Sequence, residues 1–436
     1  MYLNKFLITI FLIMGIFIPQ LKSQYNNSAF ANFENTGKSI SINGDFEAGS
    51  NGFQNVIMDR LLFGGHIDTK IKDASIKNMN GYNNLGINLN YDITAFFGKK
   101  SKYCFLLGVK DQYVLNATYT KDFYTLLMYG NKPFLNQTAN FSGTNINAMR
   151  FQEIKFGAML HNEDSTAKIG ISLSFLRGDQ LFYFMAHKNS SLYTNADGTS
   201  LALQTNFNMA LSDTSIKKNW YSFSGVGGSA DLFFESPYKS KIGSKSVLTI
   251  SANNIGFIHW LDKSPQYNSD SLIKFDGYHI NNILDLKDST LQKINSDSTL
   301  RNLTHARTEE FNTAIPTNLI IINKIYFGKK MFALSTGFRY IFSANYKPYV
   351  FVEPEFNFML GKNERLDKLG NPITKNRLSI SIHIGYGGYA YLNAGLSLAY
   401  NTKGWFIKLG SNALQGYFAP EIAYGQGLFF SLARKF

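Results

Sequence analysis

The residues that most often carry enzyme chemistry are present in this chain, but they are not at catalytic spacing. A serine hydrolase needs a nucleophilic Ser activated by a nearby His, and none of the seven histidines is followed by Ser two residues later. The chain has no Gly-x-Ser-x-Gly elbow, no His-Glu-x-x-His zinc helix and no phosphate-binding loop. Its single cysteine, Cys104, excludes an intramolecular disulfide and a multi-cysteine metal site. We therefore expect no catalytic residue, no metal site and no cofactor.

Charged side chains recur inside segments that alternate apolar and polar residues. Successive side chains of a strand point to opposite faces, so in these segments the charges share one face. A charge that faces lipid near the bilayer midplane costs ~2–4 kcal/mol, which assigns these charges to the interior. Arg339, Glu353, Glu355 and His383 lie on neighbouring carboxyl-terminal segments and are our candidate lumen-lining residues. Two interpretations stay open: they pair and stabilise the lumen, or they line a permeation path or ligand site.

The elements that carry these residues are amphipathic strands, clearest near the carboxyl terminus. Leu378–Tyr389, Tyr391–Asn401 and the segment from Trp405 each alternate apolar residues with small or polar ones. Their lengths are close to the roughly 9–11 residues that a tilted strand needs to cross a bilayer. The chain ends on Phe436, after apolar residues at alternate positions. This ending resembles the signal that the outer-membrane assembly machinery recognises, so Phe436 is our candidate assembly signal.

The composition favours a membrane barrel. Aromatic residues make up 15% of the 436 residues and charged residues only 17%, against a usual charged fraction of ~25%. After the amino terminus no apolar run reaches the ~18 residues of a transmembrane helix, so a helical membrane protein is excluded. A closed barrel is the other structure that satisfies its backbone groups in lipid. The net charge of +13 is dispersed and accompanies no nucleic-acid-binding motif, so we expect no nucleic-acid partner.

We predict an all-β fold, a transmembrane antiparallel β-barrel of about 14 strands with a range of 12–16. The count includes Ile40–Phe46 and Gln180–Leu192, whose alternation is weakest. Short connections are expected in the periplasm and long ones outside the cell. The predicted periplasmic turns are Phe97–Tyr103, Gly328–Met331 and Asn401–Trp405, and the predicted extracellular loops are Lys121–Met149, Lys263–Asn312 and Gly361–Arg377.

The amino-terminal part divides into two segments that precede the predicted barrel at 81–436. Residues 1–23 have a positive charge at Lys5, an apolar run from Phe6 to Ile18 and a small residue at Ser23, which predicts a cleaved secretory signal peptide. Residues 24–80 contain apolar residues at helical spacing after Asn51-Gly52, which predicts a short, partly helical segment. We expect this segment either to enter the lumen as a plug or hatch, or to pack beneath the barrel.

Several short stretches resemble an uncharacterised family of outer-membrane barrels from Bacteroidota. They are Asn51-Gly52-Phe53 before a helix, the strands around Gly86–Phe97 and Phe105–Lys110, and Asn254-Ile255-Gly256-Phe257-Ile258-His259-Trp260. That family is similar in architecture to barrels of the long-chain fatty-acid transporter type. The resemblance implies about fourteen strands and an amino-terminal hatch. The residues before Gly37 depart from the Asn-Pro-containing start that is typical of the family.

These observations predict a protein of the cell outer membrane that passes or takes up a small solute, a hydrophobic one among the options, through a gated lumen. A structural or secretion-associated envelope barrel that acts as a protein partner is the alternative, and an outer-membrane enzyme is third. The expected partners are outer-membrane lipid and lipopolysaccharide, the outer-membrane assembly machinery and other envelope proteins.

Overall fold

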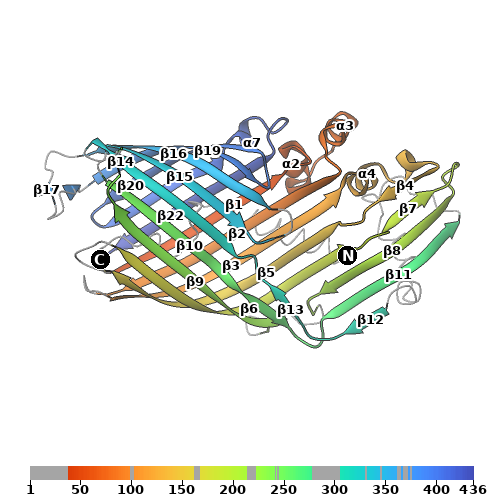
Figure 1. Ribbon diagram of the computed structural model, residues 1–436, viewed down its shortest axis with the longest axis horizontal. Helices are drawn as coiled ribbons and strands as arrows, with labels where there is room; N and C mark the ends of the chain where they lie inside the picture. The colour runs from red at the N-terminus through yellow and green to blue at the C-terminus, as the bar shows by residue number, and fades with distance from the viewer. Residues whose placement is uncertain are drawn as a thin grey trace.

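The fold is a closed antiparallel β-barrel with fourteen strands in its wall, as a computed structural model shows (Figure 1). The structure describes residues 38–98, 103–161, 167–213, 222–240, 242, 245–276, 305–328, 331–343, 346–360, 365–366, 372–373 and 376–436. In order around the wall the strands are β1 (Lys38–Ser50), β2 (Tyr82–Phe97), β3 (Tyr103–Thr120), β5 (Asn145–His161), β6 (Lys168–Ala186), β9 (Gly225–Tyr238), β10 (Lys245–Trp260), β14 (Asn318–Phe327), β15 (Phe332–Ile341), β16 (Lys347–Met359), β19 (Asn376–Gly388), β20 (Leu392–Thr402), β21 (Trp405–Ala413) and β22 (Gly425–Lys435).

The barrel closes between its first and last strands. β1 pairs with β22 from Ser39 opposite Lys435 to Gly49 opposite Gly425, and its other edge meets β2. Closure leaves no free edge in the wall, so the backbone groups of both terminal strands are paired. The predicted fold class and strand number are therefore confirmed. β1 also shows that the weak Ile40–Phe46 pattern belongs to the wall, so residues 38–50 join the barrel rather than the segment before it.

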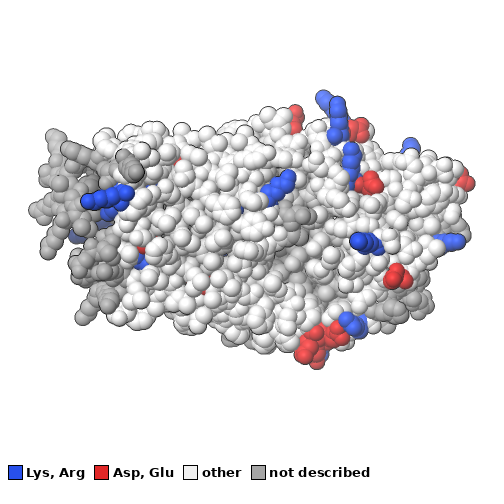
Figure 2. Space-filling model, in the orientation of Figure 1, with Lys and Arg blue, Asp and Glu red and all other residues white. Residues whose placement is uncertain are grey.

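The alternation separates a polar interior from an apolar exterior. Large apolar side chains on the outside of the wall are exposed, and examples are Phe105, Phe156, Leu173, Val350 and Ile407. Figure 2 shows this surface as a broad area with few Lys, Arg, Asp or Glu residues on the face in view. Exposed apolar side chains in a continuous belt are the expected exterior of a barrel in lipid.

The connections at the two ends of the barrel differ in content. The three predicted short turns share one end with the chain terminus at Phe436, and the connections that contain Lys121–Met149 and Lys263–Asn312 lie at the other end. Gly361–Arg377, predicted to be extracellular, joins β16 to β19 at the end that carries the short turns. The predictions of periplasmic short turns and an extracellular Gly361–Arg377 therefore cannot both hold, because strand direction puts these connections at one end and loop length is only a statistical guide to sidedness.

A second group of strands extends the wall beyond the barrel at the loop end (Figure 1). There β6 leaves β9 and pairs with β8, which pairs with β11, and β11 pairs with β12; β10 similarly leaves β14 and pairs with β13. β7 pairs with β8 along one edge and with β4 along the other. The bounds are β4 (Gln137–Asn140), β7 (Ser191–Thr194), β8 (Ser200–Leu211), β11 (Pro265–Asp276), β12 (His305–Thr308) and β13 (Phe311–Ala314), with a separate two-stranded pair β17 (Arg365–Leu366) and β18 (Pro372–Ile373).

The described helices gather at the same end, along the outside of the wall (Figure 1). They are α2 (Asn55–Phe63), α3 (Thr69–Asn78), α4 (Lys121–Tyr129), α7 (Gln415–Phe418) and a 3₁₀ turn, η2 (Lys132–Phe134). None of them is long and apolar enough to cross a membrane.

The amino-terminal helices pack against outward-facing wall residues. Phe53 and Ile57 form a buried cluster with Ala48 of β1 and Tyr119 of β3, and Leu85 of β2 packs beside it. Burying these side chains removes apolar surface from water at roughly 25 cal/mol per Å², which holds the helices on the exterior. Residues 51–80 therefore do not occupy the lumen, and the plug interpretation does not describe them. The predicted signal peptide at 1–23 and residues 24–37 lie outside the described residues.

Candidate functional site

Three of the four predicted lumen residues form one buried ionic cluster. Lys324 Nζ of β14 lies 2.8 Å from Glu355 Oε2 of β16, and His383 Nδ1 of β19 lies 3.4 Å from Glu353 Oε2. Lys408 of β21 is buried and interacts electrostatically with both glutamates. Charged side chains from neighbouring strands thus pair with one another on the inner face of the wall. This arrangement matches the stabilising interpretation for Glu353, Glu355 and His383, and a role in solute selection stays a prediction.

Arg339, the fourth predicted residue, points away from that cluster and crosses the lumen. Its Nη1 lies 2.7 Å from Glu47 Oε2 of β1, and its Nε donates to Asn318 Oδ1 at 3.3 Å. Strands β16, β19, β20, β21 and β22 separate β15 from β1 in the wall. The Arg339–Glu47 pair therefore joins distant parts of the wall through the interior.

Tyr389 forms a second connection across the lumen. It follows Gly387 and Gly388, whose φ values of +110° and +67° suit glycine and turn the chain inward at the end of β19. A Cβ atom on Gly86 of β2 would lie 2.2 Å from the Tyr389 ring, so the ring packs directly on the opposite wall. Tyr389 also packs edge-on against Tyr346, with ring centroids 4.9 Å apart. We call Arg339, Glu47 and Tyr389 the lumen barrier.

Asn254 makes a further bridge from a bulge in β10. The register of β9 and β10 shifts between Ala252 and Ile255, and Asn254 has a φ of +60°. Its side chain accepts from Lys110 Nζ at 3.3 Å and donates to Gln112 Oε1 at 3.2 Å, both on β3. The bulge re-aims one side chain from the wall into the interior.

A second ionic cluster lies on the wall beside this bridge. Glu153 of β5 is 3.3 Å from both Lys110 Nζ and Lys155 Nζ, and Lys155 pairs in turn with Asp231 of β9. Asp231 also accepts from the backbone N–H of Asn254 at 2.8 Å. All four charges are thus partnered, as buried ionic groups require.

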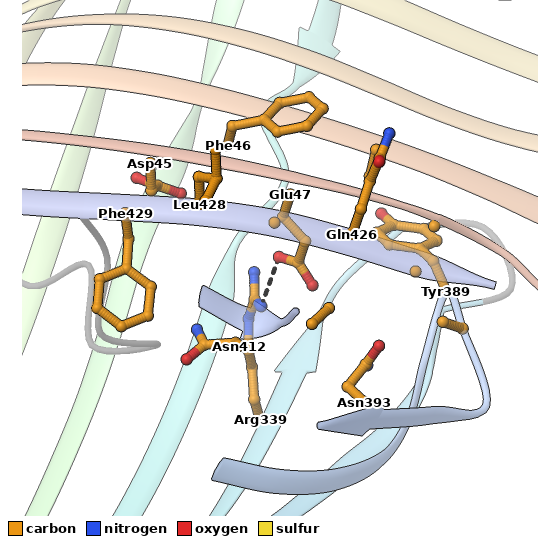
Figure 3. A pocket seen from close by; sticks show the side chains of 16 residues that line it. Asp45, Phe46, Glu47, Arg339, Tyr389, Asn393, Asn412, Gln426, Leu428 and Phe429 are labelled. Atoms are coloured by element: carbon orange, nitrogen blue, oxygen red, sulfur yellow. Dashed lines mark hydrogen bonds and ion pairs between the residues drawn. The ribbon is translucent and has the colours of Figure 1, made fainter. Parts of the chain in front are cut away.

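Two cavities lined by polar and apolar side chains border the lumen barrier. One, a small space, lies against β1, β21 and β22, where Figure 3 shows Asn393, Asn412 and Phe429 around the Arg339–Glu47 pair. The other, also small, lies between β2, β3, β10 and β14. Arg339 and Tyr389 line both cavities, so these two side chains form the partition between them. A movement of the partition would connect the two spaces.

Sequence reasoning missed Glu47, Tyr389 and Asn254. Glu47 belongs to the same alternating face of β1 as Asp45, and extending the Ile40–Phe46 pattern by one residue would have found it. Tyr389 follows a Gly-Gly pair that signals a sharp turn. The Asn253-Asn254 pair interrupts the alternation of β10, which is the pattern expected of a bulge.

Phe436 lies at the end of the described chain, next to the barrel seam. Its backbone N–H donates to Lys38 O at 3.1 Å, and its side chain is exposed beside the Arg434 guanidinium. The predicted assembly role of Phe436 stays a prediction. In the described part of the chain no group of three or more His, Cys, Asp or Glu side chains is placed to hold a metal ion.

The sequence profile of a family of unknown function, DUF5723, matches residues 31–411. The chain belongs to this family. The DUF5723 match covers the barrel from before β1 to within β21. It agrees with the resemblance to an uncharacterised barrel family, while the Bacteroidota origin stays a prediction. No curated protein matches the chain.

Solved structures with a similar barrel include three hydrocarbon channels or transporters. A TodX deltaS2S3 mutant, described as a monoaromatic hydrocarbon channel, has 9% identity and a TM-score of 0.46, with 96% of each chain covered. The toluene transporter TbuX of Ralstonia pickettii has 9% identity and a TM-score of 0.42, with 91% of this chain and 88% of that chain covered. The toluene transporter TodX of Pseudomonas putida has 9% identity and a TM-score of 0.41, with 95% and 94% covered. All three TM-scores are below 0.5, so the roles of the site's side chains rest on the contacts within this chain.

Proposed function

We propose that this protein is an outer-membrane barrel that controls the passage of a small solute through its lumen. The observation that carries this proposal is the lumen barrier, in which Arg339 reaches Glu47 across the interior between two cavities. Amides and charged groups line these cavities together with apolar side chains such as Phe429, Val114 and Ile341, so the solute can be polar or hydrophobic. The apolar exterior of the wall supports a place in the membrane.

The barrier is suited to gating because side chains form it and strand pairing does not. The guanidinium of Arg339 is held by Glu47 and Asn318, and Tyr389 is held by ring contacts and a 3.3 Å hydrogen bond with Ser343. A change of side-chain rotamer at Arg339 and a shift of the turn at Tyr389 would join the two cavities without altering the strand pairing. Passage would need neither covalent chemistry nor a cofactor.

The proposed location is the cell outer membrane, reached through the predicted signal peptide. Its exterior would contact outer-membrane lipid and lipopolysaccharide, and Phe436 would be read by the outer-membrane assembly machinery. The turn at Lys403 and Gly404, beside Phe436, is short, and short turns usually face the periplasm in such barrels, which supports a periplasmic position for this end.

The test is single-channel conductance of the purified, refolded mature protein in a planar bilayer. We expect a mostly closed channel with brief openings, and we expect Glu47→Gln and Arg339→Ala to lengthen those openings. Heat-modifiable migration on gels would establish that each protein is folded. If the folded wild type and both variants stay silent, the passage proposal fails.

The second candidate is a structural or secretion-associated barrel that binds other envelope proteins. The specific observation in its favour is that side chains fill much of the described interior, as the buried clusters around Lys324 and Lys155 show. Silent recordings from all three proteins would move this candidate to first place.

A further inference from the structure

An open vestibule lies at the loop end of the barrel, where five paired strands present one continuous inner face. Directly paired residues of adjacent strands point to the same face, and one such row runs through Asn147, Tyr183, Ala210, Gln266 and Arg307 on β5, β6, β8, β11 and β12. All five residues border a single open space of about 1130 Å³. The vestibule is therefore built from the inner face of the extension sheet.

The next row along the same face adds more amides. Asn208 of β8 pairs with Asn268 of β11, and both border the vestibule. Asn208 is exposed and Asn268 is half-buried, so their side chains are accessible from this space. Each amide offers two donor hydrogens and one acceptor oxygen. A wall of this composition matches groups that both donate and accept, as hydroxyls do.

Two amide groups of this wall have buried atoms with no partner in the part of the chain that the structure describes. They are the carbonyl oxygen Oδ1 of Asn147, an acceptor, and the nitrogen Nε2 of Gln266, a donor. A buried polar atom without a hydrogen bond costs about 1–3 kcal/mol. A ligand that reached these atoms could supply the missing hydrogen bonds.

Aromatic rings stand beside the amides. Tyr183 and Phe311 pack on the edge of a buried apolar cluster that includes Trp260 and Phe151, and the exposed ring of Phe342 borders the vestibule from the end of β15. The charge of Arg307 is balanced locally, because its Nη2 lies 2.9 Å from Glu309 Oε1. The vestibule thus combines apolar ring surface with uncharged donors and acceptors.

We propose that this vestibule binds a neutral oligosaccharide. Sugar hydroxyls donate and accept hydrogen bonds as the amides require, and the C–H faces of pyranose rings pack on aromatic side chains. An anionic ligand is disfavoured because Arg307, the cation of the row, already pairs with Glu309. This inference goes beyond the proposed passage of a solute, since binding at the vestibule needs no opening of the lumen barrier.

Isothermal titration of the purified full barrel with maltohexaose, cellohexaose and xylohexaose tests the proposal. The detergent must lack a sugar head group, which would otherwise compete for the site. We expect at least one hexasaccharide to bind the wild type, and the double variant Asn208→Ala/Asn268→Ala to weaken binding at least tenfold. The control is Ser271→Ala, which lies on β11 but on the opposite face by alternation, and its affinity should match that of the wild type.

Asn268→Asp keeps the side-chain volume, replaces the amide donors with carboxylate acceptors and adds one negative charge, so it tests recognition without emptying the site. It should weaken binding of the same hexasaccharide while the heat-modifiable migration stays unchanged. The proposal is overturned if no hexasaccharide binds the folded wild type, or if the double variant binds as well as the wild type. Equally tight binding of an oligogalacturonate hexamer would also overturn it, because the site would then recognise negative charge. Conductance recordings remain a separate measurement, so a failure here leaves the passage proposal standing.

Discussion

Removing the Arg339–Glu47 ion pair should shift the channel toward its open state. The pair spans the lumen at 2.7 Å, with Arg339 3% exposed and Glu47 25% exposed. Close charge pairs measured by double-mutant cycles contribute about 1.5–7 kcal/mol, and the partial exposure of Glu47 places this pair near the lower end, at about 2 kcal/mol. A tenfold change corresponds to about 1.4 kcal/mol, so loss of a contact that exists only in the closed state should raise the open-to-closed ratio about 30-fold.

Single-channel recording measures that ratio directly for Arg339→Ala and Glu47→Gln. The matched control is Lys168→Ala, because the Lys168–Glu235 pair has a similar 2.8 Å separation but joins the adjacent strands β6 and β9 along the wall. That variant should keep the wild-type ratio. The double exchange Glu47→Arg/Arg339→Glu should restore closure. Open-to-closed ratios in Arg339→Ala and Glu47→Gln that equal the wild-type value, with folded barrels, would refute the barrier as a gate.

Three further predictions concern the rest of the barrier, the buried charges and the sidedness. Gly86→Val should displace Tyr389, whose ring a Cβ there would approach to 2.2 Å, and so raise conductance; unchanged traces would show that the ring does not obstruct the lumen. Lys155→Met should destabilise the barrel by about 3–5 kcal/mol, because Glu153 and Asp231 lose a buried partner, and the temperature of the heat-modifiable transition should fall. In a Cys104→Ala background a membrane-impermeant maleimide should label Thr199→Cys but not Lys403→Cys on intact cells; the reverse pattern would invert the proposed topology.

The strands were predictable because their signal is local. Alternation over about ten residues fixes which side chains face inward, and it correctly grouped Glu353, Glu355 and His383 on one inner face. It could not show that Arg339 leaves this group, because its partner Glu47 lies on a strand at the other end of the chain. Which side chains meet inside a barrel depends on how the wall closes and on the stagger between its strands. Those are properties of the whole wall and not of any segment.

The amino-terminal helices show a different limit of sequence patterns. The apolar spacing after Asn51 correctly indicated a helix with one apolar face, which is α2. An apolar face requires a partner surface but does not identify it, and a lumen and an outer wall both offer one. The position of α2 is decided by three wall residues that face outward, Ala48, Leu85 and Tyr119. The amino-terminal segment packs on them and removes them from water. Their role becomes visible only when the strands are aligned.

The charged groups inside the barrel and the amides of the vestibule have different roles. Inside the wall the charges of Lys155, Asp231 and Lys324 have partners within the chain, so they stabilise the closed form without any ligand. At the vestibule Asn147 and Gln266 retain buried atoms that lack partners among the described residues. A ligand that satisfied them would gain free energy that the empty protein cannot recover internally. A solute arriving from the loop end would meet these amides before it reached Arg339. Binding at the vestibule and gating at the lumen barrier would then be successive steps that use different residues.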